Sequence, residues 1–230
     1  MLIGPQNLTL HVNHVRSRIR SAANAAGRDP GTVTLVAVTK TKTAETIRLA
    51  ATAGVTDFGE NYLQEALAKM DSLADLQLRW HFIGAIQSNK TRPIAERFDW
   101  VHSVDRLSIA KRLSEQRPFH APPLQVCIQV MLVPEPTKGG VELDALPKLA
   151  AAVAALPRIQ LRGLMCLPPP QPDAAAERAV FAQLRGALQD LNAGGLKLDT
   201  LSMGMSADFE SAIAEGATLV RIGTALFGAR

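Results

Sequence analysis

Aromatic residues and long apolar runs are scarce in this sequence. Only 4% of its 230 residues are aromatic, which argues against the stacking platform of a protein that binds single-stranded nucleic acid. No apolar stretch reaches the ~18 residues of a membrane-spanning helix, and the N-terminus lacks the basic start and apolar block of a secretory signal. We therefore expect a cytoplasmic protein that has neither nucleic acid nor a membrane as its partner.

Cysteines and runs of like charge are also scarce. Cys127 and Cys166 are the only cysteines, and both lie within apolar runs, which predicts reduced thiols in a core. The 25 basic residues exceed the 21 acidic ones, but they are spread along the chain without a run of five or more. Such a mild excess is typical of a site for a small phosphorylated anion, or of no site at all. We assign no metal site.

Short apolar strands alternate with amphipathic helices along the chain. An opening helix carries Leu8, Val12, Val15 and Ile19 on one face, and eight strand–helix units follow. We expect the strands at 33–39, 56–59, 80–84, 100–104, 124–130, 161–166, 200–203 and 219–222. This order predicts an α/β fold, a parallel (β/α)8 TIM barrel with an extra N-terminal helix.

An open, doubly wound sheet is the competing architecture. The first strand is not followed by the G-x-G-x-x-G turn that such sheets use for dinucleotides. No linker, repeat or low-complexity stretch divides the chain. We therefore predict one domain over residues 1–230.

The first predicted strand ends on a lysine. The apolar run from Leu35 leads to Lys40, and Thr43 is a good N-cap for the next helix. An amine at a rigid strand end can attack a carbonyl to form a Schiff base. From this segment alone, a solvated lysine is the simpler interpretation. Lys42 alternates with Lys40 and should point the other way.

Functional residues of such barrels lie on the loops that leave the C-terminal ends of the strands. The last two of these loops contain Gly204–Ser206, which we expect to open the seventh helix, and Gly223 with Thr224. Free backbone N–H groups at a helix start favour an anion, and phosphate sites of barrels recur at these two loops. The alternative is that Ser206 is only an N-cap and Gly223 only a tight turn.

A closed barrel places the eighth strand beside the first, so Lys40 would face a molecule whose phosphate is held by the last two loops. This combination suggests either pyridoxal 5′-phosphate (PLP) or the substrate of a Schiff-base sugar-phosphate aldolase. Arg221 bears on the choice, because an arginine that faces a pyridine nitrogen keeps it unprotonated and weakens the electron sink of the ring. Arg221 could equally form a structural ion pair inside the barrel.

Seven motifs together resemble one family in order and spacing, the pyridoxal phosphate homeostasis proteins (the YggS/PROSC family). They are Val38–Lys42, Phe58–Glu65, Trp80–Gly84, Gln87–Lys90, Arg162–Met165, Leu201–Ser206 and Val220–Gly228. The resemblance implies a barrel like the N-terminal domain of alanine racemase, with PLP bound to Lys40 as a Schiff base. It also implies that Arg221 lies near the pyridine nitrogen. The other cofactor-binding positions that it implies are Asn61, His81, Met203, Ser206, Gly223 and Thr224.

The sequence departs from the family pattern at three places. Thr39 stands where serine is usual, and Thr43 stands where proline is usual. The loop 131–137 replaces a more polar one, although Lys138 and Gly140 match the pattern.

Two functional classes follow from the resemblance. The first is a carrier without established turnover that holds PLP and delivers it to PLP-dependent apo-enzymes, as a monomer or weak dimer. The second is a small PLP-dependent amino-acid racemase or lyase. A two-base racemase needs a second acid–base group across the cofactor, and the racemases of this fold use a tyrosine from another subunit. Tyr62 is the only tyrosine here. We therefore favour the carrier and assign no catalytic residue.

Overall fold

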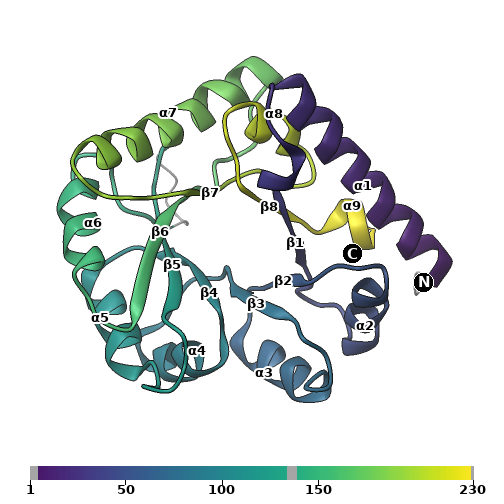
Figure 1. Ribbon diagram of the computed structural model, residues 1–230, viewed down its shortest axis with the longest axis horizontal. Coiled ribbons are helices and arrows are strands. Elements are labelled where there is room, and N and C mark those ends of the chain that lie inside the picture. Colours follow the sequence, from purple (N-terminus) through teal and green to yellow (C-terminus); the bar gives the residue numbers. More distant parts are fainter. Residues whose placement is uncertain (1–4, 134–138, 229–230) are drawn as a thin grey trace.

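The computed structural model describes residues 5–133 and 139–228. Its strands form one closed parallel barrel in the order β1 to β8, with helices around the outside (Figure 1). The strands are β1 Thr34–Val38, β2 Asp57–Glu60, β3 Arg79–Phe82, β4 Trp100–Val104, β5 Leu124–Gln129, β6 Ile159–Met165, β7 Thr200–Ser202 and β8 Leu219–Ile222. The predicted TIM barrel is confirmed. The predicted ranges of the fourth and eighth strands agree with β4 and β8, and the other strands differ by one or two residues at their ends.

The helices surround the barrel unevenly. They are α1 Pro5–Ala25, α2 Ala44–Thr52, α3 Leu63–Ser72, α4 Thr91–Arg97, α5 Leu107–Gln116, α6 Leu146–Ala154, α7 Ala174–Ala193, α8 Phe209–Ala214 and α9 Thr224–Phe227, with 3-10 turns η1 Pro30–Thr32 and η2 Ser88–Lys90. The last helix, α9, has only four residues and is too short to cover the strand before it. Helix α1 fills this place, because it packs against α8, α9 and α2 (Figure 1). Leu8, Val12 and Val15 of α1 are fully buried there.

The seam between β1 and β8 closes the barrel. Val36 lies opposite Asp57 of β2 on one side and opposite Arg221 of β8 on the other. Alternate residues of a strand point to the same face, and Val38 lines a pocket inside the barrel mouth together with Arg221, so Val36 and Arg221 both face the barrel interior. Thr43 accepts a hydrogen bond from the N–H of Thr46 at 3.2 Å, which confirms it as the N-cap of α2.

The hydrophobic core forms a single cluster. Large side chains such as Phe58, Phe98 and Phe181 fill the space between the sheet and the helices and are almost fully buried. Cys127 and Cys166 are buried and unpaired, as predicted, and burial raises the pKa of each thiol to about 12. In the part of the chain that the structure covers, none of the helices has the length and hydropathy of a membrane span.

Gly163 of β6 tests how tightly neighbouring strands pack. A Cβ atom at this position would lie 1.8 Å from the carbonyl oxygen of Thr200 on β7. We predict that Gly163→Ala lowers the free energy of unfolding by about 3 kcal/mol or more, because the two backbones must separate. Urea titration followed by circular dichroism measures this change.

Gly186 provides the matched control. It lies within α7, and a Cβ there would meet nothing within 4 Å. Gly186→Ala should raise the free energy of unfolding by about 0.5–1 kcal/mol, since alanine favours a helix interior. Equal effects of the two substitutions would contradict the register of β6 and β7.

Candidate functional site

A pocket of about 420 Å³ opens at the C-terminal mouth of the barrel. Apolar side chains of Val38, Ile83 and Leu167 form part of its wall. It is also lined by six residues that the sequence singled out, namely Lys40, Asn61, Ser206, Arg221, Gly223 and Thr224. The barrel therefore brings most of the predicted site together from its first, second, seventh and eighth strands.

The amine of Lys40 is unpaired at the edge of this pocket in the described part of the chain. Lys40 is half-buried in the pocket wall, and its Nζ has no hydrogen bond or ion pair within the described part of the chain. Lys42 differs, because its Nζ donates to the carbonyl oxygen of Phe227 at 3.2 Å and lies outside the pocket. Lys90, in η2, does not line the pocket either. Lys138 lies outside the described residues.

A buried ionic cluster holds the backbone on both sides of Lys40. Lys69 of α3 donates to the carbonyl oxygen of Thr39 at 2.7 Å and to the carboxylate of Glu60 at 2.7 Å. Glu65 accepts the N–H of Thr41 at 2.6 Å and also pairs with Lys69 at 2.5 Å. The hydroxyl of Thr39 donates to Glu60 at 2.6 Å. The strand end that presents the free amine is therefore anchored from behind.

Burial has the largest effect on the pKa of Glu60 in this cluster. Glu60 is fully buried, which raises the pKa of its carboxyl group, and hydrogen bonds from Lys69 and Thr39 only partly offset this. Sequence reasoning missed the cluster. Glu60 and Glu65 belong to one of the family motifs, but spacing alone does not reveal that they support Lys40 from outside the pocket.

Arg221 forms the inner wall of the pocket. Only 3% of the residue is exposed, and burial lowers the pKa of its guanidinium. It donates to the hydroxyl of Ser202 at 2.6 Å and to the carbonyl oxygen of Cys166 at 2.8 Å. A guanidinium has five N–H donors and no acceptor. The donors outside these two hydrogen bonds are available to an acceptor in the pocket.

The last two loops meet through Ser206. Its hydroxyl oxygen accepts the N–H of Ala225 at 3.2 Å and so joins the loop after β7 to α9. The prediction that Gly204–Ser206 opens the seventh helix is wrong, because α8 begins at Phe209. The carboxylate of Asp208 accepts the N–H of Met205 at 2.6 Å and holds this segment in a turn instead.

Asn61 carries an unpaired polar atom at the pocket. Its side-chain oxygen is buried and has no hydrogen-bond partner in the described structure. Gly84 lies against it, and a Cβ on Gly84 would come within 2.1 Å of the carbonyl oxygen of Asn61. Only glycine permits this approach, so Gly84 fixes where the loop after β2 meets the mouth.

His81 and Met203 are the two predicted site residues that do not line the mouth pocket. Both are almost fully buried. The ring of His81 is inside the barrel, where it bonds Asp57 at 3.0 Å and His102 at 2.9 Å. Burial lowers the pKa of His81, although Asp57 partly opposes this. Both ring nitrogens of His81 are already engaged by protein groups, and its assignment as a cofactor-binding residue stays a prediction.

The comparisons with known proteins first define a class. Residues 10–230 match the family model of the alanine racemase N-terminal domain. The crystal structure of alanine racemase from Corynebacterium glutamicum has the same fold at 20% identity, with a TM-score of 0.70, and the match covers 95% of this chain and 61% of the racemase.

Closer relatives narrow this class. The chain is 64% identical to the pyridoxal phosphate homeostasis protein of Pseudomonas aeruginosa, over 96% of this chain and 94% of the relative. It is 51% identical to the protein of the same name from Escherichia coli K12, over 94% of each. PipY from Synechococcus elongatus, whose structure was solved with PLP bound, is 40% identical to this chain in sequence. The two structures match with a TM-score of 0.86 over 96% of this chain and 100% of PipY. The chain belongs to the family of pyridoxal phosphate homeostasis proteins, as its motifs predicted.

Asp57 should make the stability of the protein depend on pH. Burial alone would raise the pKa of this carboxyl group, but hydrogen bonds from His81, Arg79 and Thr56 outweigh it and hold the pKa well below its usual value. A lowered pKa in the folded state stabilises the protein above the unfolded-state pKa of about 4, and this stabilisation is lost as the pH falls through the folded-state value. We predict that the stability advantage of the wild type over Asp57→Asn is largest above about pH 4 and shrinks in more acidic solution.

Asp71→Asn is the control for this pH series. Asp71 pairs with Arg97 at 2.6 Å, but its side chain is 67% exposed. Such surface pairs contribute about 1 kcal/mol or less. Unfolding free energies from chemical denaturation at each pH provide the comparison, and an Asp57→Asn effect as small and as pH-independent as that of Asp71→Asn would contradict the prediction.

Proposed function

We propose that this protein holds PLP reversibly on Lys40 and takes part in the homeostasis and delivery of the cofactor inside the cell. The observation that carries the proposal is the shared pocket, in which the free amine of Lys40, the guanidinium of Arg221 and the last two loops meet. The names of the relatives and the PLP bound to PipY support it.

The residues present fit this cofactor. PLP supplies an aldehyde, an aromatic ring with a nitrogen acceptor, and a phosphate. Lys40 supplies the amine that attacks the aldehyde carbon, and a C=N bond forms with loss of water. Arg221, which can only donate, suits the ring nitrogen. Ser206, Gly223 and Thr224 lie where barrel folds bind phosphate. The unpaired oxygen of Asn61 is a further polar contact.

Release of PLP breaks the same C=N bond. Water, or the lysine of a PLP-dependent apo-enzyme, attacks the C=N carbon and returns the amine of Lys40. Recipient apo-enzymes are therefore the partners that we propose. A cytoplasmic location and a monomeric or weakly dimeric state remain predictions.

The pocket favours a carrier over a racemase or lyase. Arg221 keeps a proton off the ring nitrogen, and this weakens the electron sink that carbanion chemistry requires. Tyr62, the only tyrosine, is 54% exposed and does not line the pocket. It therefore cannot serve as the second acid–base group within this chain.

The identity of the reactive lysine is directly testable. We predict that Lys40→Ala removes the absorbance of the bound cofactor at about 420 nm while the far-ultraviolet circular dichroism stays that of the wild type. Borohydride reduction of the wild type followed by peptide mapping should place the modification on Lys40.

Lys42→Ala is the matched control for this experiment. The amine of Lys42 is tied to Phe227 outside the pocket, so its removal should leave the absorbance in place. Retention of the absorbance in Lys40→Ala, or fragment ions that place the modification on Lys42, would refute the assignment.

Exchange of an amino acid's α-proton distinguishes a carrier from a racemase. We predict that PLP-loaded protein incorporates no more than a trace of solvent deuterium into alanine, because the pocket provides a weak electron sink and no tyrosine. Mass spectrometry of the recovered amino acid measures this exchange. Incorporation at a rate typical of an enzyme, about 1 per second or faster, would favour the racemase.

A further inference from the structure

A line of buried side chains crosses the barrel interior and ends on Arg221. Arg221 contacts Ser202 at 2.6 Å, Ser202 contacts Nδ1 of His102 at 2.7 Å, and Nε2 of His102 contacts Nδ1 of His81 at 2.9 Å. Nε2 of His81 contacts Asp57 at 3.0 Å. All five residues are nearly or fully buried. We call them the interior chain.

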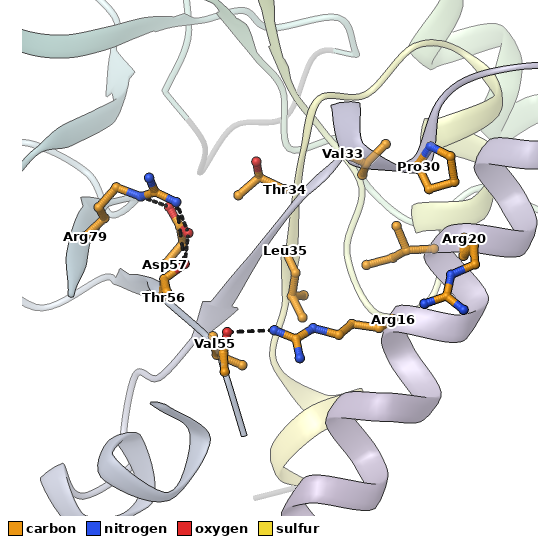
Figure 2. A pocket seen from close by; sticks show the side chains of 13 residues that line it. Arg16, Arg20, Pro30, Val33, Thr34, Leu35, Val55, Thr56, Asp57 and Arg79 are labelled. Atoms are coloured by element: carbon orange, nitrogen blue, oxygen red, sulfur yellow. Dashed lines mark hydrogen bonds and ion pairs between the residues drawn. The ribbon is translucent and has the colours of Figure 1, made fainter. Parts of the chain in front are cut away.

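The interior chain connects the two ends of the barrel. Its Arg221 end lines the mouth pocket. Its Asp57 end lines a second hollow of about 370 Å³ among the N-terminal ends of β1, β2 and β3, where Arg79 forms two hydrogen bonds with Asp57 (Figure 2). Barrel interiors of this fold are usually filled by branched apolar side chains. A polar line through this space is costly to bury unless every member is hydrogen-bonded.

With both histidine rings neutral, simple valence fixes the direction of every hydrogen bond in the chain. Arg221 can only donate, and the ionised Asp57 can only accept. Each neutral histidine has one donor and one acceptor nitrogen, so donation must run from Arg221 to Ser202, then to His102, His81 and Asp57. Both histidines then carry their proton on Nε2. Burial, which lowers the pKa of both rings, favours this neutral arrangement over a charged one.

This direction determines what Ser202 offers to Arg221. Because the hydroxyl proton of Ser202 is directed to His102, only its lone pairs face the guanidinium. The carbonyl oxygen of Cys166 holds a second N–H of Arg221 at 2.8 Å. Two fixed acceptors on one side set the plane of the guanidinium, and its other donors are left for the mouth pocket.

We propose that Ser202 and His102 are positioning residues that fix the guanidinium of Arg221 through a one-directional hydrogen-bond chain anchored on Asp57. The effect on cofactor binding rests on the function proposed above, whereas the chain itself is a property of the protein alone. Through this chain, a carboxylate at the closed end of the barrel orients the group that faces the pyridine nitrogen of PLP at the open end.

Other ionisable groups also face the chain and must be held constant in any test. Arg79 and Asp99 act on its His81 end. At the Arg221 end, the neighbours are Asp208, Cys127 and Cys166. None of these residues is altered in the variants below.

The first test uses the full-length protein without cofactor. ¹⁵N NMR of labelled histidine side chains at neutral pH should identify His81 and His102 as neutral rings protonated on Nε2, with assignments made from His102→Gln. A His102 ring protonated on Nδ1, or an imidazolium at either position, would overturn the proposed direction. This result does not depend on whether PLP binds.

The second test removes the acceptor of Arg221. Ser202→Ala should bind PLP on the order of tenfold more weakly, because a hydrogen bond to a charged group is lost. The pH midpoint of the change in the bound cofactor's absorbance should also lie higher than in the wild type. The reason is that a less fixed guanidinium repels a proton on the ring nitrogen less strongly. Ser202→Thr keeps the hydroxyl, so its affinity for PLP and its absorbance midpoint should both stay those of the wild type.

Ser114→Ala is the matched control. Ser114 is also a buried serine, but its hydroxyl donates to the carbonyl oxygen of Pro157, away from the interior chain. It should leave the affinity and the absorbance midpoint unchanged. If Ser202→Ala keeps both wild-type values, or if Ser114→Ala shifts the midpoint equally, the positioning role is refuted. Failure of the wild type to bind PLP would instead refute the function proposed above.

Discussion

The pairing of β1 with β8 is the constraint on which the rest of the structure depends. It joins segments from opposite ends of the chain, so that Val36 lies beside Arg221 in register. Because all strands are parallel, their C-terminal ends share one mouth. Lys40 and the loop at Gly223 therefore line one pocket although nothing in their local sequences links them. Helix α1 covers the same seam from outside, which explains why the fold has an additional helix before its first strand.

Two polar systems serve the two ends of the proposed cofactor site. The cluster of Glu60, Glu65 and Lys69 holds the strand end that carries Lys40, and the interior chain holds Arg221. Glu60, Lys69 and the five residues of the interior chain are buried, and a buried charge without a partner is more costly than an apolar replacement. The barrel retains them where branched apolar residues would pack with less risk. We infer that these buried polar residues are present because they position the amine of Lys40 and the guanidinium of Arg221, and not because they stabilise the fold.

Much of the fold followed from the sequence because its signals are local. Apolar runs of strand length and the N-cap at Thr43 need no knowledge of distant contacts. The start of α8 was placed too early, since the turn at Asp208 depends on one side chain closing on the N–H of Met205. The family resemblance named His81 as a cofactor-binding position, but a motif does not show how deep a side chain lies in the barrel. Depth depends on the tilt and stagger of the closed barrel, which no single strand encodes.

The chemistry of the pocket suits storage better than turnover. An enzyme that uses PLP as an electron sink gains from a protonated ring nitrogen, whereas Arg221, which we propose faces that atom, can only donate to it. The amine of Lys40 has no partner in the described residues that would serve as an acid or base in later steps. In the function proposed above, the pocket would provide a reversible bond, an oriented ring and a place for the phosphate. A cofactor held in this way would be retained unchanged until water or another amine competes for its aldehyde carbon.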